Sequence, residues 1–267
     1  MRLPIITLTT DFGHRDAYVA AMKGAILGIC PQATLVDVSH CVPAQDVAAG
    51  AFLLHSAHRF FPPGTVHVAV VDPGVGSDRR GIVVETAHGV FVGPDNGLFG
   101  PVYELGPVER IVEIRNPDLM LPRISSTFHG RDIFGPVAAH LSMGTPVDEV
   151  GPEVDEPAGL SLWELVEGDG ELRGRIVHID HFGNGITNLQ RGRIEAAAGG
   201  GTARVCVGDR VFSGVSRAYA EAADGEPLVL YGSQDAIEVS VNGGSAEASL
   251  GLKRGDEVTV KWEEKTE

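Results

Sequence analysis

Residues 67–81 read H-V-A-V-V-D-P-G-V-G-S-D-R-R-G, and this stretch decides the fold. Its first five residues form a run of β-favouring and small side chains, which is typical of a strand buried in a parallel sheet. The proline and the two glycines that follow Asp72 then break the run and predict a tight loop. Asp72 therefore stands at the carboxyl end of a strand, the edge of an open α/β sheet at which ligands bind.

Arg79 follows Asp72 by seven residues and can fold back toward the carboxylate, because the intervening glycines permit turns that β-branched residues resist. A hairpin of residues 81–86 and 90–93 is predicted next. The G-V-G-S-D-R-R-G stretch is therefore not a dinucleotide-binding fingerprint, which needs a helix at that place. Taken alone, the stretch is also compatible with a surface turn that carries a solvated Asp and Arg.

The rest of the first half alternates between strands and helices. Strands are predicted at 5–9 and 34–38, and helices at 17–29, at 47–60 with Asp46 as N-cap, and at 134–142 as the last clear helix. Strands that read as continuous apolar runs, with helices between them, favour a parallel sheet covered by helices on its faces.

The second half has a different pattern. Residues 148–170 are acidic and rich in Pro and Gly, which indicates a connector. Beyond them, short strands separated by turn residues favour a small antiparallel barrel or sandwich. They are predicted at 173–180, 186–189, 203–207, 228–231, 236–241 and 257–262. The sequence thus predicts an α/β N-terminal domain with a mainly parallel sheet (1–155), a linker (156–170) and a smaller all-β, barrel-like C-terminal domain (171–267).

Composition restricts the function. The chain has 267 residues and a net charge of -15, with no run of Lys or Arg, so binding to nucleic acid or to an anionic membrane is disfavoured. Three cysteines without a C-x-x-C pair, and the lack of a long apolar segment near the N-terminus, favour a cytoplasmic protein. His55 and His58 have no ligand-like companions, so they are interpreted as surface residues and no metal site is predicted.

Three further loops carry polar side chains at predicted strand ends: Asp11 in T-T-D-F-G, Asn96 in P-D-N-G-L and His129 in S-T-F-H-G-R-D. Loops at one edge of a sheet can converge with the Asp72 loop on one crevice. Each residue also has a purely structural interpretation. Asp11 could cap the following helix, Asn96 could belong to a turn, and His129 could be a hydrogen-bonded core histidine.

Five motifs occur together along the chain: T-T-D-F-G-x-x-D-x-Y-V, V-D-P-G-V-G-x-x-R-R, G-P-D-N-G-L, F-H-G-R-D-I-F-x-P-x-A-A-H-L and D-x-F-G-N-x-x-T-N-L. In their order they resemble the S-adenosyl-L-methionine (SAM) hydroxide adenosyltransferases, the water-using relatives of the fluorinases and chlorinases. The resemblance covers nearly the whole chain. It implies a homotrimer with inter-subunit active sites, and hydrolysis of SAM to adenosine and L-methionine without a cofactor, since SAM is the substrate.

The same resemblance implies a catalytic set of Asp72, Arg79 and His129. Attack at the 5' carbon of SAM expels a neutral thioether, so the leaving group needs no acid, whereas water is a weak nucleophile. A carboxylate and an imidazole can orient water and accept or relay its proton, and a guanidinium favours the ionised carboxylate. Which group finally holds the proton stays open.

Substrate contacts are also implied by the resemblance. Asp11 would bind the ribose hydroxyls, because one carboxylate can accept two hydrogen bonds from a cis diol. Gln234 stands where relatives carry an Arg for the substrate carboxylate, so that contact has no assigned residue. The other substrate-binding residues expected are Asn96, Asp180, Phe182, Asn184, Ser233 and Asn242.

Two alternative functions stay open. A SAM-dependent halogenase of the same superfamily is disfavoured because Asp72 places negative charge where a halide would sit. A SAM- or adenosine-binding protein without turnover is disfavoured by the joint presence of Asp72, Arg79 and His129, because binding alone requires no water-activating set.

Overall fold

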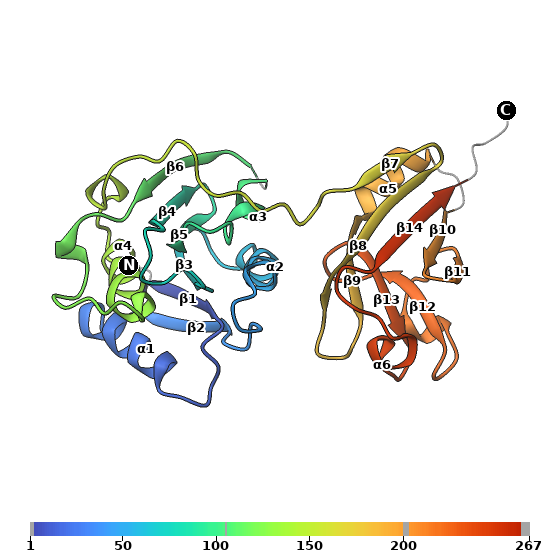
Figure 1. Ribbon diagram of the computed structural model, residues 1–267, viewed down its shortest axis with the longest axis horizontal. Helices are drawn as coiled ribbons and strands as arrows, with labels where there is room; N and C mark the ends of the chain where they lie inside the picture. The colour runs from blue at the N-terminus through green and yellow to red at the C-terminus, as the bar shows by residue number, and fades with distance from the viewer. Residues whose placement is uncertain (1–2, 105, 200–202, 263–267) are drawn as a thin grey trace. The chain divides into compact units, whose positions relative to one another are not determined.

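The computed structural model describes residues 3–104, 106–199 and 203–262 of the chain. The chain divides into two compact units, Met1–Ser161 (unit 1) and Leu162–Glu267 (unit 2), shown in Figure 1. None of the helices in the described part of the chain combines the length and the apolar character that a membrane span requires.

Unit 1 is built on a six-stranded mixed sheet in the order β2-β1-β3-β5-β4-β6. The first four strands in this order are parallel to one another, and β4 pairs antiparallel with both β5 and β6. The register places Leu8, Val68 and Val92 side by side in the core. The predicted α/β class is thereby confirmed, and so is the hairpin after Arg80. The strands are β1 (Ile5–Thr10), β2 (Thr34–Ser39), β3 (Thr65–Val70), β4 (Gly81–Thr86), β5 (Gly89–Pro94) and β6 (Val108–Glu113).

Helices cover both faces of this sheet (Figure 1). On one face α1 (Tyr18–Ile29) packs against α4 (Gly135–Ser142), and on the other α2 (Val47–His58) packs against α3 (Gly100–Tyr103). The Asp46 carboxylate accepts a hydrogen bond from the Ala49 N–H at 3.0 Å, which confirms the predicted N-cap of α2. The short helices are η1 (Pro117–Leu119), η2 (Gly130–Phe134), which is a π-helix that leads into α4, and η3 (Val147–Glu149).

The interpretation of His55 and His58 as surface residues is wrong, because His55 is only partly exposed and His58 is buried. His58 lies on the inner face of α2, with its ring 5.6 Å from that of Phe91 and 6.1 Å from that of His67. Its Nδ1 is 3.2 Å from the Leu54 carbonyl and 3.0 Å from that of His55. A histidine can occupy an apolar face when its own helix supplies hydrogen-bond partners. The residue spacing alone did not show that His58 has such partners.

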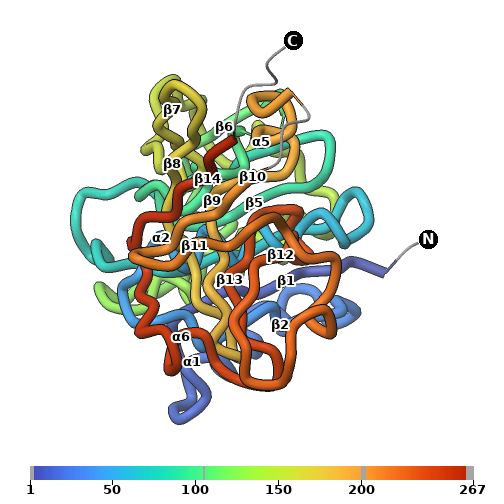
Figure 2. The backbone as a smooth tube through the Cα atoms, turned by 90° about the vertical axis from the view of Figure 1, so that its right-hand side faces the viewer, coloured from blue at the N-terminus to red at the C-terminus, as the bar shows by residue number. Residues whose placement is uncertain are grey.

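Unit 2 is an antiparallel, nearly closed, barrel-like sheet in the order β11-β10-β14-β8-β9-β13-β12, with β7 paired to β8. All six predicted strands are present, and β12 and β13 run side by side in Figure 2. The sequence did not predict β7, β11 or the two helices. The elements are β7 (Val166–Gly168), β8 (Glu171–Ile179), β9 (Gly185–Gln190), α5 (Arg191–Ala198), β10 (Ala203–Val207), β11 (Arg210–Ser213), η4 (Tyr219–Glu221), β12 (Pro227–Tyr231), β13 (Ala236–Val241), α6 (Ala246–Leu250) and β14 (Glu257–Trp262).

Candidate active site

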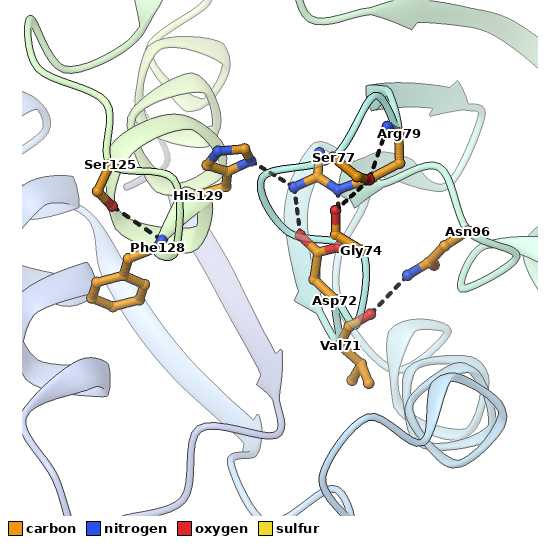
Figure 3. Close-up of polar contacts among 9 residues, drawn as sticks. All are labelled: Val71, Asp72, Gly74, Ser77, Arg79, Asn96, Ser125, Phe128 and His129. Atoms are coloured by element: carbon orange, nitrogen blue, oxygen red, sulfur yellow. Dashed lines mark hydrogen bonds and ion pairs between the residues drawn. The ribbon is translucent and has the colours of Figure 1, made fainter.

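Asp72 lies two residues beyond the end of β3, a strand whose six residues are all buried. The loop after it is folded by its own hydrogen bonds. The Val75 N–H donates to the Asp72 carbonyl at 3.2 Å, and the Ser77 hydroxyl donates to the Gly74 carbonyl at 2.7 Å. The Arg79 N–H in turn donates to the Ser77 hydroxyl at 3.3 Å. These turns bring the Arg79 side chain back to Asp72 (Figure 3).

Arg79 connects Asp72 to His129. Its Nε and Nη2 donate to the two carboxylate oxygens of Asp72 at 2.9 and 2.5 Å, and Nη2 also lies 2.7 Å from Nδ1 of His129 (Figure 3). The Asp72 side chain is 6% exposed and that of Arg79 12% exposed. The guanidinium lies 5.2 Å from the centre of the Phe134 ring, which also limits its freedom. The structure therefore brings the three residues of the expected catalytic set together.

The contact with Arg79 fixes the tautomer of His129. A guanidinium can only donate hydrogen bonds, so Nδ1 must accept and the proton of the neutral ring must be on Nε2. Burial lowers the pKa of His129, and so does Arg79. Asp72, Asp132 and a hydrogen bond with the Ser125 backbone act in the opposite direction, but the net shift is downward. His129 is thus neutral near pH 7 and cannot gain a proton at Nδ1 while it holds Arg79.

Gly76 allows the Asp72 loop to approach the segment before His129. A Cβ on Gly76 would lie 2.3 Å from the Ser126 carbonyl oxygen, closer than any side chain permits. The residue also has φ +79°, in the left-handed region that favours glycine. Arg79 and His129 face a cavity of about 390 Å³ that Ser77, Gly81 and Ile133 also line. The geometry allows a small molecule such as water to reach both side chains.

Asp11 and Asn96 follow β1 and β5, the two strands that flank β3 in the sheet of unit 1. The Asp11 carboxylate accepts the Gln45 N–H at 2.8 Å, and Gln45 has φ +66°. Asp11 does not cap α1, which begins after Ala17 without a side-chain cap, so the capping interpretation is wrong. The Asn96 amide donates to the Val71 carbonyl at 2.8 Å (Figure 3), and the Asn96 side-chain oxygen accepts the Leu98 N–H at 3.2 Å. Asn96 therefore fastens the backbone next to Asp72.

In unit 2, Asp180 organises the loop that joins β8 to β9. Its carboxylate accepts the Phe182 N–H at 2.9 Å, the Asn184 N–H at 2.8 Å and the Asn184 side-chain amide at 3.0 Å. The loop is tight enough that a Cβ on Gly183 would lie 2.0 Å from the Ser245 hydroxyl. Phe182 is left 72% exposed.

Phe182 and Asn184 line one groove of about 490 Å³ together with Tyr219, Val241 and Ser245. Three other expected binding residues of unit 2, Asp180, Ser233 and Asn242, are not among the groove-lining residues. Ser233 is exposed between β12 and β13, and Asn242 follows β13 and donates through its amide to the Ala222 carbonyl at 2.9 Å. The structure thus gathers only part of the expected set in unit 2.

The structure adds two residues that the sequence did not single out. Tyr219 faces the groove, and its hydroxyl donates to the buried Glu238 carboxylate at 2.5 Å; burial, then Glu238, raises the pKa of Tyr219. Asp132 is a fully buried carboxylate three residues after His129. The F-H-G-R-D motif contained a signal for Asp132, because Arg131 directly before it can supply the partner that a buried aspartate needs. In the described residues, no group of three or more His, Cys, Asp or Glu side chains could hold a metal ion, and the need for no metal or cofactor stays a prediction.

Comparisons with known proteins agree with this geometry. Residues 6–151 match the SAM hydroxide adenosyltransferase N-terminal domain, and residues 174–259 match the C-terminal domain of that family. The chain is 40% identical to the (R)-S-adenosyl-L-methionine hydrolase of Salinispora arenicola over 96% of this chain and 97% of the relative. It is 30% identical to the fluorinase of Actinopolyspora mzabensis over 96% and 97%. A crystal structure of an uncharacterized conserved protein from Thermotoga maritima superimposes with a TM-score of 0.89 at 37% identity, over 96% of this chain and 99% of that one.

Proposed function

The chain belongs to the SAM hydroxide adenosyltransferase family, and from that membership we propose that it is an enzyme that hydrolyses SAM to adenosine and L-methionine. The observation that carries the proposal is the Arg79 guanidinium between Asp72 and His129. Water attacks the 5' carbon, the bond from that carbon to sulfur breaks with its electron pair on sulfur, and the attacking water loses one proton. The thioether leaves uncharged, so the protein's task is to raise the nucleophilicity of water.

The geometry supports different roles for the two groups that could accept a proton, Asp72 and His129. Arg79 uses one hydrogen-bonding direction at each Asp72 oxygen, and a carboxylate offers about four in all, so Asp72 can still accept a hydrogen bond from water. Nδ1 of His129 is already occupied by Arg79. We therefore assign acceptance of the water proton to Asp72. The neutral His129 holds the guanidinium in place.

Binding of SAM is assigned to the polar loops of both units. We propose that Asp11 binds the ribose hydroxyls and that Asn96 supports the Asp72 strand end. Phe182 and Asn184, shaped by Asp180, would contact the substrate from the groove of unit 2. We propose further substrate contacts from Ser233 and Asn242, which lie outside the groove-lining residues. These assignments rest on the family motifs and on the contacts described above.

Incubation with SAM in water enriched in oxygen-18 tests the function. The proposal expects adenosine that carries the label in its 5' hydroxyl, together with unlabelled methionine, and no dependence on added metal. Unlabelled adenosine would exclude direct attack by water. A halogenase would instead form a 5'-halogenated nucleoside in chloride or fluoride, which the negative charge of Asp72 disfavours. A protein that binds SAM calorimetrically but forms no adenosine would be the non-catalytic alternative.

We also propose a homotrimer with inter-subunit active sites in the cytoplasm. The assembly is supported by the family resemblance and by substrate-binding motifs that are distant in the sequence. The compartment is supported by the described cysteines, which form no disulfide. Light scattering should give three times the 28.1 kDa chain mass, and dilution to monomers should abolish turnover. A fully active monomer would contradict this arrangement, and cell fractionation tests the compartment.

A further inference from the structure

Asp132 is a buried charge that the proposed chemistry does not use. It lies in the π-helix η2 and is 0% exposed. Arg131 donates to its two oxygens at 2.6 and 3.0 Å, and the Ser125 N–H donates to one of them at 2.8 Å. Burial raises the pKa of the Asp132 carboxyl, but the hydrogen bonds from Arg131 and Ser125 outweigh that effect and lower it. The carboxylate is therefore ionised and satisfied.

Its contacts reach the whole segment before His129, residues 121–128. The Asp132 carbonyl accepts the Leu121 N–H at 2.9 Å, and the Asp132 N–H donates to the Phe128 carbonyl at 3.2 Å. The Ser125 hydroxyl, whose own backbone is held by Asp132, accepts the Phe128 N–H at 3.1 Å (Figure 3). Asp132 thus holds the beginning and the end of this segment through its backbone and the middle through its carboxylate.

The segment determines where the His129 ring lies. Phe128 directly precedes His129, so a shift of the segment would rotate the imidazole away from Arg79. Ser126, next to Ser125, is the residue against which Gly76 of the Asp72 loop packs. The position of the Asp72 loop and that of His129 therefore both depend on residues 121–128.

We propose that Asp132 is a positioning residue that holds His129 in the Nε2–H tautomer, with Nδ1 toward Arg79, by anchoring residues 121–128. The inference deepens the proposed function and rests on it for the role of His129. Asp132 also holds Arg131, whose guanidinium lies 5.0 Å from the centre of the Phe128 ring. In Asp132→Asn the side-chain N–H₂ group would face Arg131 or the Ser125 N–H, and two donors cannot form a hydrogen bond with each other. The carboxylate is therefore required, and an uncharged side chain of the same shape does not replace it.

The direct test is ¹H–¹⁵N NMR of the His129 ring in the full-length protein without SAM, assigned with His129→Gln. The wild type should show one tautomer with the proton on Nε2. In Asp132→Asn the ring should show both tautomers in exchange. Asp95→Asn is the matched control. The Asp95 carboxylate is also buried and accepts hydrogen bonds from Arg80 at 2.8 Å and from the Ala158 N–H at 2.7 Å, and both partners lie outside residues 121–128. It should lose stability without changing the His129 tautomer.

Kinetics give the second readout. Asp132→Asn should lower kcat roughly 10- to 100-fold, as loss of a group that orients a functional histidine does in metal sites, and should leave the KM for SAM within about threefold. Ser125→Ala, a loop variant expected to fold, should show a smaller loss of about 3- to 10-fold, the range for one hydrogen bond.

Two outcomes overturn the inference: a folded Asp132→Asn protein with the wild-type tautomer and kcat, or, where that variant does not fold, Ser125→Ala with both unchanged. Wild-type turnover in His129→Gln would instead overturn the proposed role of His129. That result would leave the NMR experiment valid, because it is recorded without substrate.

Discussion

Asp72 in unit 1 and Asp180 in unit 2 both follow the end of a strand and both begin a glycine-containing loop, but their carboxylates have different partners. Asp72 is bound by the charged side chain of Arg79, which also reaches His129 on a distant element. Asp180 is bound by three uncharged donors of its own loop. The Asp180 carboxylate binds donors of its own loop and therefore stabilises that loop. The Asp72 carboxylate is hydrogen-bonded to an arginine that also contacts a histidine, and such a group can take part in proton transfer. Changes in the first unit should therefore affect the chemical step, and changes in the second should affect binding.

Arg79→Met should produce the largest effect. It removes both contacts that join Asp72 to His129 and leaves the carboxylate without its cation. We expect kcat to fall about 1,000- to 10,000-fold, the upper part of the range for loss of acid–base machinery. SAM affinity, measured by calorimetry, should change little. Arg110→Met is the control. It removes the ion pair between Arg110, on the edge strand β6, and Asp148, and the variant should turn over normally.

Gly76→Ala should come second. The new methyl group would collide with the Ser126 carbonyl and separate the two loops of the proposed catalytic set, and a misplacement of about 1 Å can cost about 100-fold in rate. Gly64→Ala is a matched control, because Gly64 has φ +83° but a methyl group added there would meet no heavy atom within 4 Å. Equal kcat values for the two variants would show that the loop contact is irrelevant to turnover.

Acid should unfold unit 1 before unit 2. Burial lowers the pKa of His67 to about 3 and that of His55 to about 4, whereas both side chains titrate near 6.5 when unfolded. The unfolded chain then binds more protons, so stability is complete above pH 6.5 and falls as the pH drops toward 3. The loss is about 2 kcal/mol at pH 5 for His67 alone.

The two tryptophans provide the readout, since Trp163 and Trp262 both belong to unit 2. On acidification, helical circular dichroism should decrease at a higher pH than tryptophan fluorescence changes. His67→Gln, which keeps a hydrogen-bonding partner for Thr7, should reduce the pH dependence. Coincident transitions with an unaltered pH dependence in that variant would exclude the histidines as the cause.

Asp180→Asn should have the smallest effect. The amide oxygen can replace one of the two acceptor oxygens of Asp180. The amide N–H₂ group would face donors of the same loop and lose the other hydrogen bonds, so Phe182 and Asn184 would be held less firmly. We expect KM for SAM to rise about 10-fold with kcat unchanged. Asp209→Asn, in the exposed turn after β10, is the control. A large fall in kcat for Asp180→Asn would remove the distinction between the two aspartates.

Local patterns accounted for much of the fold. The apolar run before Asp72 gave a strand that is buried along its length, and the turn residues at 87–89 gave the hairpin of β4 and β5. β6 was missed because V-E-R-I-V-E is an edge strand in which only Val112 is buried, so it lacks the apolar run that marked the inner strands. α5 was missed because R-G-R-I-E-A-A-A buries only Ile194 and has no apolar face.

Contacts within the candidate site were predictable where both residues belong to one short motif. Glycines between Asp72 and Arg79 indicated the return of the side chain, and the family motifs supplied His129. The bond from Asp132 to Ser125 and the packing of Gly76 on Ser126 depend on how loops meet in space, which residue spacing does not encode. The burial of His58 has the same origin.

The most direct test of the account separates binding from chemistry at Asp72. Asp72→Asn keeps the shape of the side chain but can neither carry charge nor accept the proton of water. Calorimetric titration with SAM and rapid-quench single-turnover measurement of adenosine should be made on the same preparation. For Asp72→Asn we predict SAM affinity close to wild type and a chemical step slowed about 100- to 10,000-fold. An unchanged chemical step, or a loss confined to affinity, would contradict it.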